Sequence, residues 1–226
     1  MLQLDLLLRH KPVAQSVELK TYCVCFIYVN LQGAKHMAQA KTFSPQELRR
    51  GLDYVASRMH APRNRAIVLT QHLAGLRVGE CAALTWADVV TDAGQVRDEI
   101  HLRAEQTKRG HARTVFVSER LRKELQRYVD TTAKRAGDWA FFYTQQKPRR
   151  GFTANTLANH VRWLYKNAGI VGASSHSGRR TFATNLANQG TGIRVLMRLM
   201  GHRNISTTAV YIDANDDMLR RAVELA

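Results

Sequence analysis

Cysteine is scarce in this chain of 226 residues, which contains only Cys23, Cys25 and Cys81. Three cysteines are too few for a disulfide framework, and no second Cys or His pair completes a zinc-binding pattern around the first two. This scarcity excludes the small disulfide-stapled proteins and fits a protein of the reducing cytoplasm.

Long hydrophobic runs are missing as well. The longest apolar stretch, near residues 21–31, is about half the length of a membrane-spanning helix. The N-terminus also lacks the cleavage region of a signal peptide. The sequence therefore predicts a soluble, cytoplasmic protein with no membrane partner.

Acidic residues are few: 18 Asp and Glu stand against 34 Lys and Arg, giving a formal net charge of +16 and a pI near 10.4. Half of this excess lies in residues 101–150, which carry a net charge of +8. Such a field concentrates polyanions, so nucleic acid is the natural partner. A solvated basic surface or an anionic membrane surface would give the same composition.

The chain is long enough for one core, and its patterns are mainly helical. Ser44-Pro45-Gln46-Glu47 combines an N-cap, a first-turn proline and a capping-box Glu before Leu48, Leu52, Val55 and Met59 at helical spacing. Alternation at Ile100, Leu102 and Ala104, and again at Val115 and Val117, predicts two strands joined by a basic hairpin over residues 106–111. Further helices are expected at about 62–75, 77–84, 118–137, 153–169, 177–189, 193–200, 204–211 and 214–225. The expected fold class is α+β, mainly α: a helical bundle with a small antiparallel sheet.

One short motif joins two groups that suit phosphate chemistry. His176-Ser-Gly-Arg179 places an imidazole and a guanidinium three residues apart at a helix start, so both can reach one phosphate. Breaking a DNA strand without a metal requires cationic donors for the phosphate oxygens, a nucleophile and an acid for the leaving oxygen. A single His-x-x-Arg motif arises often by chance and proves little alone.

Several segments in order resemble the signature boxes of the tyrosine recombinases, the phage integrase family. Ala74-Gly-Leu-Arg77-Val-Gly-Glu80, followed by Leu84-Thr-Trp-Ala-Asp88, resembles the first box. The later segments are His176-Ser-Gly-Arg179-Arg-Thr-Phe-Ala-Thr184, Leu199-Met-Gly-His202 and Thr207-Thr-Ala-Val-Tyr211. Thr107-Lys108, which precedes Arg113-Thr-Val-Phe-Val117, matches the family's hairpin pattern. The resemblance runs from about Phe43 to Leu225.

The resemblance implies the integrase catalytic fold over residues 44–226 and a reaction that needs no metal and no other cofactor. It also implies double-stranded DNA as the partner and a homo-oligomer, a tetramer, on that DNA. The implied roles are Arg77 and Arg179 stabilising the phosphorane, Lys108 protonating the leaving 5′-oxygen, His176 assisting proton removal, His202 donating to phosphate, Glu80 supporting, and Tyr211 attacking.

Residues 1–43 form an N-terminal extension of unclear role, where family members usually carry a helical core-binding domain. Within the motifs, Gly178 and Ser177 stand where leucine and aspartate are frequent.

Two alternatives to a recombinase stay open. One is a type IB topoisomerase-like enzyme that reseals its own strand, and the other is a truncated remnant that binds DNA without cutting.

Overall fold

The structure, a computed structural model, describes residues 39–108, 110–144, 150–212, 219–220 and 223–224. The chain divides into two units after Gln39, and the elements named here belong to the second, Ala40–Ala226. Most of the predicted N-terminal extension, 1–43, lies outside the described residues, as does most of the predicted final helix, 214–225. The elements are α2 (Pro45–Ala56), α3 (Ala61–Ala74), α4 (Val78–Ala83), α5 (Trp86–Val89), β1 (Glu99–Leu102), the 3₁₀ helix η1 (Ala104–Gln106), β2 (Arg113–Phe116), α6 (Glu119–Asp130), α7 (Ala154–Asn167), α8 (Ser177–Asn188), α9 (Ile193–Met200) and α10 (Ile205–Ala209).

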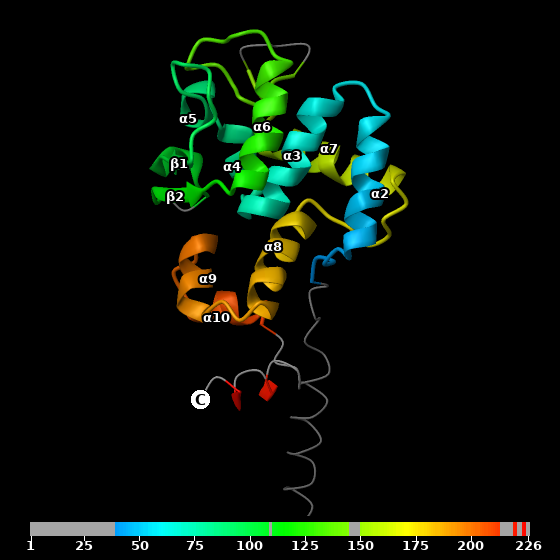
Figure 1. Cartoon of the computed structure of the whole chain (residues 1–226), viewed down its shortest axis with the longest axis vertical. Coiled ribbons are helices and arrows are strands. Elements are labelled where there is room, and N and C mark those ends of the chain that lie inside the picture. The colour runs from blue at the N-terminus through cyan, green and yellow to red at the C-terminus, as the bar shows by residue number, and fades with distance from the viewer. Residues whose placement is uncertain (1–38, 109, 145–149, 213–218, 221–222, 225–226) are drawn as a thin grey trace, which may run out of the picture. The chain divides into compact units, whose positions relative to one another are not determined.

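The expected class, mainly helical with a small antiparallel sheet, is confirmed, as Figure 1 shows. The start of α2 is also as predicted. The Ser44 hydroxyl accepts a hydrogen bond from the Glu47 backbone at 3.2 Å, and the Glu47 carboxylate accepts from the Ser44 backbone at 3.0 Å. These two bonds satisfy backbone donors that the first turn of a helix would otherwise leave unpaired.

Two helices end earlier than the sequence patterns predict. α2 ends at Ala56, so Met59 lies beyond it and is 77% exposed. α6 ends at Asp130, well before Gly137, because the hydroxyls of Thr131 and Thr132 both donate to the Tyr128 carbonyl and close the last turn. A side chain that takes over a backbone acceptor in this way competes with continuation of the helix.

The two strands form one antiparallel pair in which Ile100 faces Val115 and Leu102 faces Arg113. Residues directly opposite each other project from the same face of a sheet. Ile100, Leu102 and Val115 are buried, so this register sends the Arg113 side chain toward the interior.

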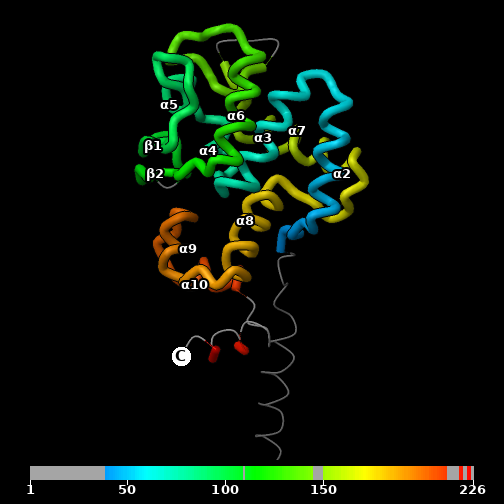
Figure 2. Tube along the Cα trace, in the orientation of Figure 1, coloured from blue at the N-terminus to red at the C-terminus, as the bar shows by residue number. Residues whose placement is uncertain are grey.

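Among the residues that the structure describes, buried apolar side chains form two clusters. The larger draws on α2 to α7 and both strands, and its helix α3 packs against α6 and also against α8. The smaller consists of Ala183, Ala187, Leu196 and Met200, from α8 and α9. Figure 2 shows α8 leading from the bundle toward α9 and α10. Residues at the start of α8 therefore lie where the two clusters meet.

The glycine at position 178, where leucine is frequent in the resembled motif, has a packing explanation. A Cβ added to Gly178 would lie 2.8 Å from the His72 Nδ1 atom and 2.9 Å from the Gln71 Cβ atom. His72 is buried, and its Nδ1 lies 3.0 Å from the Val68 carbonyl oxygen. The imidazole thus fills the space beside α8, and glycine permits the close approach of α3.

We expect Gly178→Ala to destabilise the protein by about 1–3 kcal/mol, because the added methyl group overpacks a filled interior. Gly79→Ala is the matched control, since Gly79 is likewise the second residue of its helix and its added Cβ would meet only the Ala154 Cβ atom, at 3.6 Å. Urea unfolding followed by circular dichroism measures both variants. Equal stabilities for the two would contradict the packing explanation.

Candidate active site

The structure places the sequence-predicted residues at the ends of short elements. Arg77 is the N-cap of α4, and Lys108 lies in the turn between η1 and β2. His176 is the N-cap of α8, with Arg179 in its first turn. His202 and Tyr211 follow α9 and α10. Short elements that end close together can bring residues distant in sequence to one place.

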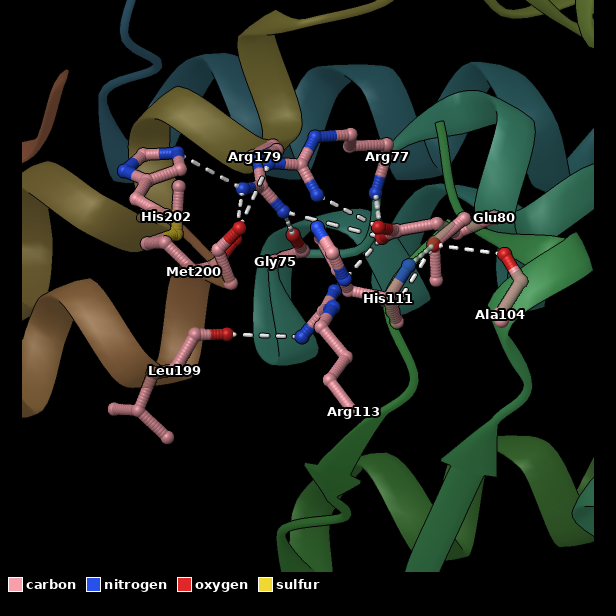
Figure 3. A network of polar contacts seen from close by, with 12 residues as sticks. Gly75, Arg77, Glu80, Ala104, His111, Arg113, Arg179, Leu199, Met200 and His202 are labelled. Atoms are coloured by element: carbon pink, nitrogen blue, oxygen red, sulfur yellow. Dashed lines mark hydrogen bonds and ion pairs between the residues drawn. The ribbon is translucent and has the colours of Figure 1, made fainter. Parts of the chain in front are cut away.

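A buried carboxylate holds the arginines together. The Glu80 side chain, 1% exposed, accepts hydrogen bonds from the Arg77 guanidinium at 2.7 Å, the Arg77 backbone N–H at 2.8 Å and the Arg113 guanidinium at 2.7 Å. A terminal nitrogen of Arg179 lies 4.0 Å from the same carboxylate. Figure 3 shows Arg77 and Arg113 reaching Glu80 from opposite sides. Three guanidinium groups around one carboxylate leave positive charge for an anionic ligand.

The charges of this cluster depend on one another. Burial alone would raise the pKa of Glu80, but Arg113 first, and then the Arg77 backbone and Arg179, bring this pKa below its usual value. Burial and the charge of Arg77 lower the pKa of Arg179, whereas Glu80 raises it. An arginine pKa starts so high that the guanidinium remains charged at neutral pH. The site therefore holds a carboxylate and three cations.

The C-terminal end of α9 docks into this cluster through its carbonyl groups. Arg113 donates to the Leu199 carbonyl at 3.0 Å, Arg179 donates to that of Met200, and Arg77 donates to that of Gly201 at 3.4 Å. The last carbonyls of a helix have no intrahelical partners and carry the negative end of its dipole. Three successive carbonyls thus each accept from a different arginine.

The docked helix end fixes the position of His202. The His202 Nε2 atom lies 3.2 Å from Arg179, and its Nδ1 atom lies 3.0 Å from the Thr208 hydroxyl of α10. The ring of Tyr211 stacks on that of His202 with centroids 5.9 Å apart, and the Arg180 guanidinium lies 5.6 Å from the Tyr211 ring centroid. The phenol is therefore held between an imidazole and a cation, next to the arginine cluster.

His176 and Lys108 lie on the exposed side of the site. Partial burial, followed by the positive charges of Arg179, Lys108, Arg77 and Arg162, lowers the pKa of His176. A lowered pKa keeps the imidazole neutral at neutral pH, the state that accepts a proton. The charges of Lys108 and Arg77, which come from two other parts of the chain, thus both act on the ring of His176.

The turn that carries Lys108 is closed by a neighbouring side chain. The Thr107 hydroxyl donates to the Ala104 carbonyl or the His111 carbonyl, each 3.0 Å away, and accepts from the His111 backbone N–H at 3.0 Å. Figure 3 includes part of this turn beside the arginines. A side-chain hydroxyl that serves several backbone groups holds a tight turn in one shape.

Two further residues belong to the site but were given no role from the sequence. Thr208 contacts His202, and nothing in its motif distinguishes it from Thr207. The orientation of Arg113 could have been inferred from the sequence. It lies two residues before Val115 in an alternating strand, so the pattern places it on the buried face. A buried arginine needs an anionic partner, and Glu80 is the one it meets.

Within the described residues, no group of three or more His, Cys, Asp and Glu side chains is arranged to hold a metal ion. In the same part of the chain, no helix is long and apolar enough to cross a membrane.

Such a site can bind a phosphodiester, and comparison with known proteins identifies the class. Residues 41–218 match the phage integrase family, so the chain belongs to that family. The tyrosine recombinase XerA of Thermococcus kodakarensis is 32% identical over 167 residues, which are 73% of this chain and 55% of that protein. The chain therefore spans about half the length of such relatives.

Solved structures show the same fold. The crystal structure of XerA recombinase superposes with a TM-score of 0.64 at 28% identity, covering 81% of this chain and 64% of that one. The Tn1549 transposon integrase (residues 82–397), solved in complex with circular intermediate DNA, gives a TM-score of 0.65 at 22% identity. Its alignment covers 89% of this chain and 76% of the integrase. The predicted integrase catalytic fold is thus confirmed.

Proposed function

We propose that this chain is the catalytic domain of a site-specific tyrosine recombinase, which cleaves and rejoins DNA through a 3′-phosphotyrosyl intermediate. The observation that carries the proposal is the gathering of Arg77 and Arg179 around Glu80, with His202 beside Arg179 and Tyr211 stacked on His202. The order of these residues along the chain, together with membership of the family, supports the proposal, and their contacts with one another support a single phosphate as their shared ligand.

In the proposed cleavage step, the Tyr211 oxygen attacks the phosphorus atom while the bond from phosphorus to the 5′-oxygen breaks. The phenol proton passes to His176, whose pKa is lowered by partial burial and then by the neighbouring cations, and Lys108 protonates the leaving 5′-oxygen. Arg77, Arg179 and His202 donate to the non-bridging oxygens as charge develops. Attack by a 5′-hydroxyl on the phosphotyrosine reverses the step: it re-forms one phosphodiester bond and releases the Tyr211 oxygen.

The test is covalent capture on a denaturing gel. Nicked suicide duplexes tiled across the DNA that flanks the gene lose a short fragment after cleavage, so the adduct accumulates. We expect a protein band shifted by the mass of the attached strand. A chain that binds these duplexes but forms no adduct with any of them would instead support the DNA-binding remnant.

Strand exchange separates a recombinase from a topoisomerase-like enzyme. We propose that the chain acts as a homo-oligomer, a tetramer, on double-stranded DNA, because exchange requires the cleaved strand of one site to join a strand of another. Branched-junction resolution should follow adduct formation. Relaxation of supercoils without any joining of strands from two sites would favour the type IB alternative.

We expect DNA binding to depend steeply on salt, because the net charge of +16 makes phosphate contacts the main source of affinity. With only about four phosphates neutralised, affinity should fall roughly a hundredfold between about 50 and 200 mM monovalent salt. Fluorescence anisotropy with a labelled duplex measures the dependence. Affinity that stays level over this range would contradict an electrostatic origin.

A further inference from the structure

The side chain of Arg113 joins three elements that must be in register for cleavage. From the inner face of β2 it donates to Glu80 of α4 at 2.7 Å and to the Leu199 carbonyl of α9 at 3.0 Å. It stands five residues after Lys108, at the end of the turn that Thr107 closes. The planar fork of an arginine suits this double attachment, because its two terminal nitrogens point in fixed directions.

Arg113 is less exposed than Arg77, although the guanidinium groups of both bond to Glu80. Its side chain is 11% exposed, compared with 25% for Arg77, which approaches Glu80 from the opposite side. Its two terminal nitrogens bond to Glu80 of α4 and to the Leu199 carbonyl of α9, two elements that are far apart in the sequence. This geometry suits a residue that holds other groups in place.

The opposite flank of the Lys108 turn is held independently. Gln106 is buried and donates to the Ala83 carbonyl at 2.9 Å and to the Asp88 carboxylate at 2.6 Å. The turn is thus anchored on one side through Gln106 and on the other through Arg113. Only the Arg113 anchor also reaches α9, the helix that precedes His202.

Gly201 is adapted to the position of Arg113. It ends α9 with a φ of +59°, and a Cβ on it would lie 2.6 Å from the Arg113 Cδ atom. The Met197 and Arg198 carbonyls are satisfied by the backbone N–H groups of His202 and Gly201. The arginine stem therefore packs directly against the helix end whose Leu199 carbonyl it binds.

We propose that Arg113 is a positioning residue that holds the Lys108 turn in register with the α9 end and hence with His202 and Tyr211. A bound phosphate would take hydrogen bonds from Arg77 and Arg179. These two arginines would then donate less to the Gly201 and Met200 carbonyls, which they bond in the free protein. The bond from Arg113 to the Leu199 carbonyl is not drawn to the phosphate, so it keeps the end of α9 docked. This inference rests on the proposed recombinase function.

The test compares Arg113→Lys with Arg122→Lys. Arg122 supplies the matched control because it is an arginine on α6 whose guanidinium bonds to Glu119 at the surface. Lysine keeps the charge beside Glu80 but lacks the fork that reaches two partners. We expect Arg113→Lys to bind DNA as Arg122→Lys does, and to form the covalent adduct about 10- to 100-fold more slowly, as misplacement of a catalytic group by about 1 Å does.

A second substrate tests the link to Lys108. A 5′-bridging phosphorothiolate leaves without needing an acid, so the rate deficit of Arg113→Lys should be several-fold smaller on it than on ordinary DNA. Equal deficits on the two substrates would overturn the link to the Lys108 turn. A deficit in adduct rate matched by an equal loss of DNA affinity would make Arg113 a phosphate ligand, which also overturns the proposal.

Further outcomes separate this inference from the proposed function. An Arg113→Lys rate equal to that of Arg122→Lys refutes the inference alone, whereas a wild-type protein that forms no adduct refutes the function. Arg113→Gln provides a second variant and should be slower still. If neither Arg113 variant unfolds cooperatively on heating, the residue is structural and the positioning role is wrong.

Discussion

Tyr211→Phe should abolish covalent capture of DNA while leaving DNA binding intact. The substitution removes only the phenolic oxygen, so the ring can keep its stacking on His202 and its contact with Arg180. No other group in the proposed mechanism can replace the nucleophile, and adduct on suicide duplexes should fall below detection. Anisotropy should give a dissociation constant within about twofold of the wild type, since no charge is lost.

Tyr54→Phe is the matched control for this experiment. Tyr54 lies on α2, where its ring contacts Trp163 and the Arg58 guanidinium. This variant should form adduct at the wild-type rate. An adduct formed by Tyr211→Phe would show that another residue attacks the phosphate.

Lys108→Ala should form adduct on ordinary DNA about 10²- to 10⁴-fold more slowly than the wild type, which is the usual contribution of a general acid. The 5′-alkoxide is a poor leaving group unless it is protonated. A 5′-bridging phosphorothiolate needs no such proton, so this substrate should restore rapid cleavage by Lys108→Ala. It should not restore cleavage by Tyr211→Phe, because that variant lacks the attacking atom.

Lys123→Ala removes the same charge from the exposed face of α6, where Lys123 lies 3.6 Å from Glu119. It should cleave both substrates at the wild-type rates. If the sulfur substrate leaves Lys108→Ala as slow as ordinary DNA does, then Lys108 is not the acid. His176 would be the next residue to test, since it lies within the electrostatic reach of Lys108.

The fold was largely predictable because its helices begin and end at local sequence features. Ser44 and Glu47 are close in sequence, so the capping box of α2 could be recognised from the sequence alone. The end of α6 could not be predicted, because it depends on which backbone carbonyl accepts the hydrogen bonds of the Thr131 and Thr132 hydroxyls. A propensity pattern carries no information about that choice.

The candidate residues came from ordered motifs, whereas the contacts that hold them together come from tertiary structure. Glu80 lies three residues from Arg77, and that pair could be expected from helical spacing. The bonds from Arg113, Arg179 and Arg77 to successive carbonyls of α9 join residues far apart in sequence. They depend on where the end of α9 docks, which no short-range pattern specifies.

The most direct test of the account is to identify the amino acid that carries the DNA. Protein trapped on a suicide duplex is digested with nuclease and protease, and the modified peptide is sequenced by mass spectrometry. We expect a nucleotide joined through its 3′-phosphate to the oxygen of Tyr211. A nucleotide on any other residue, or one attached through a 5′-phosphate, would contradict it.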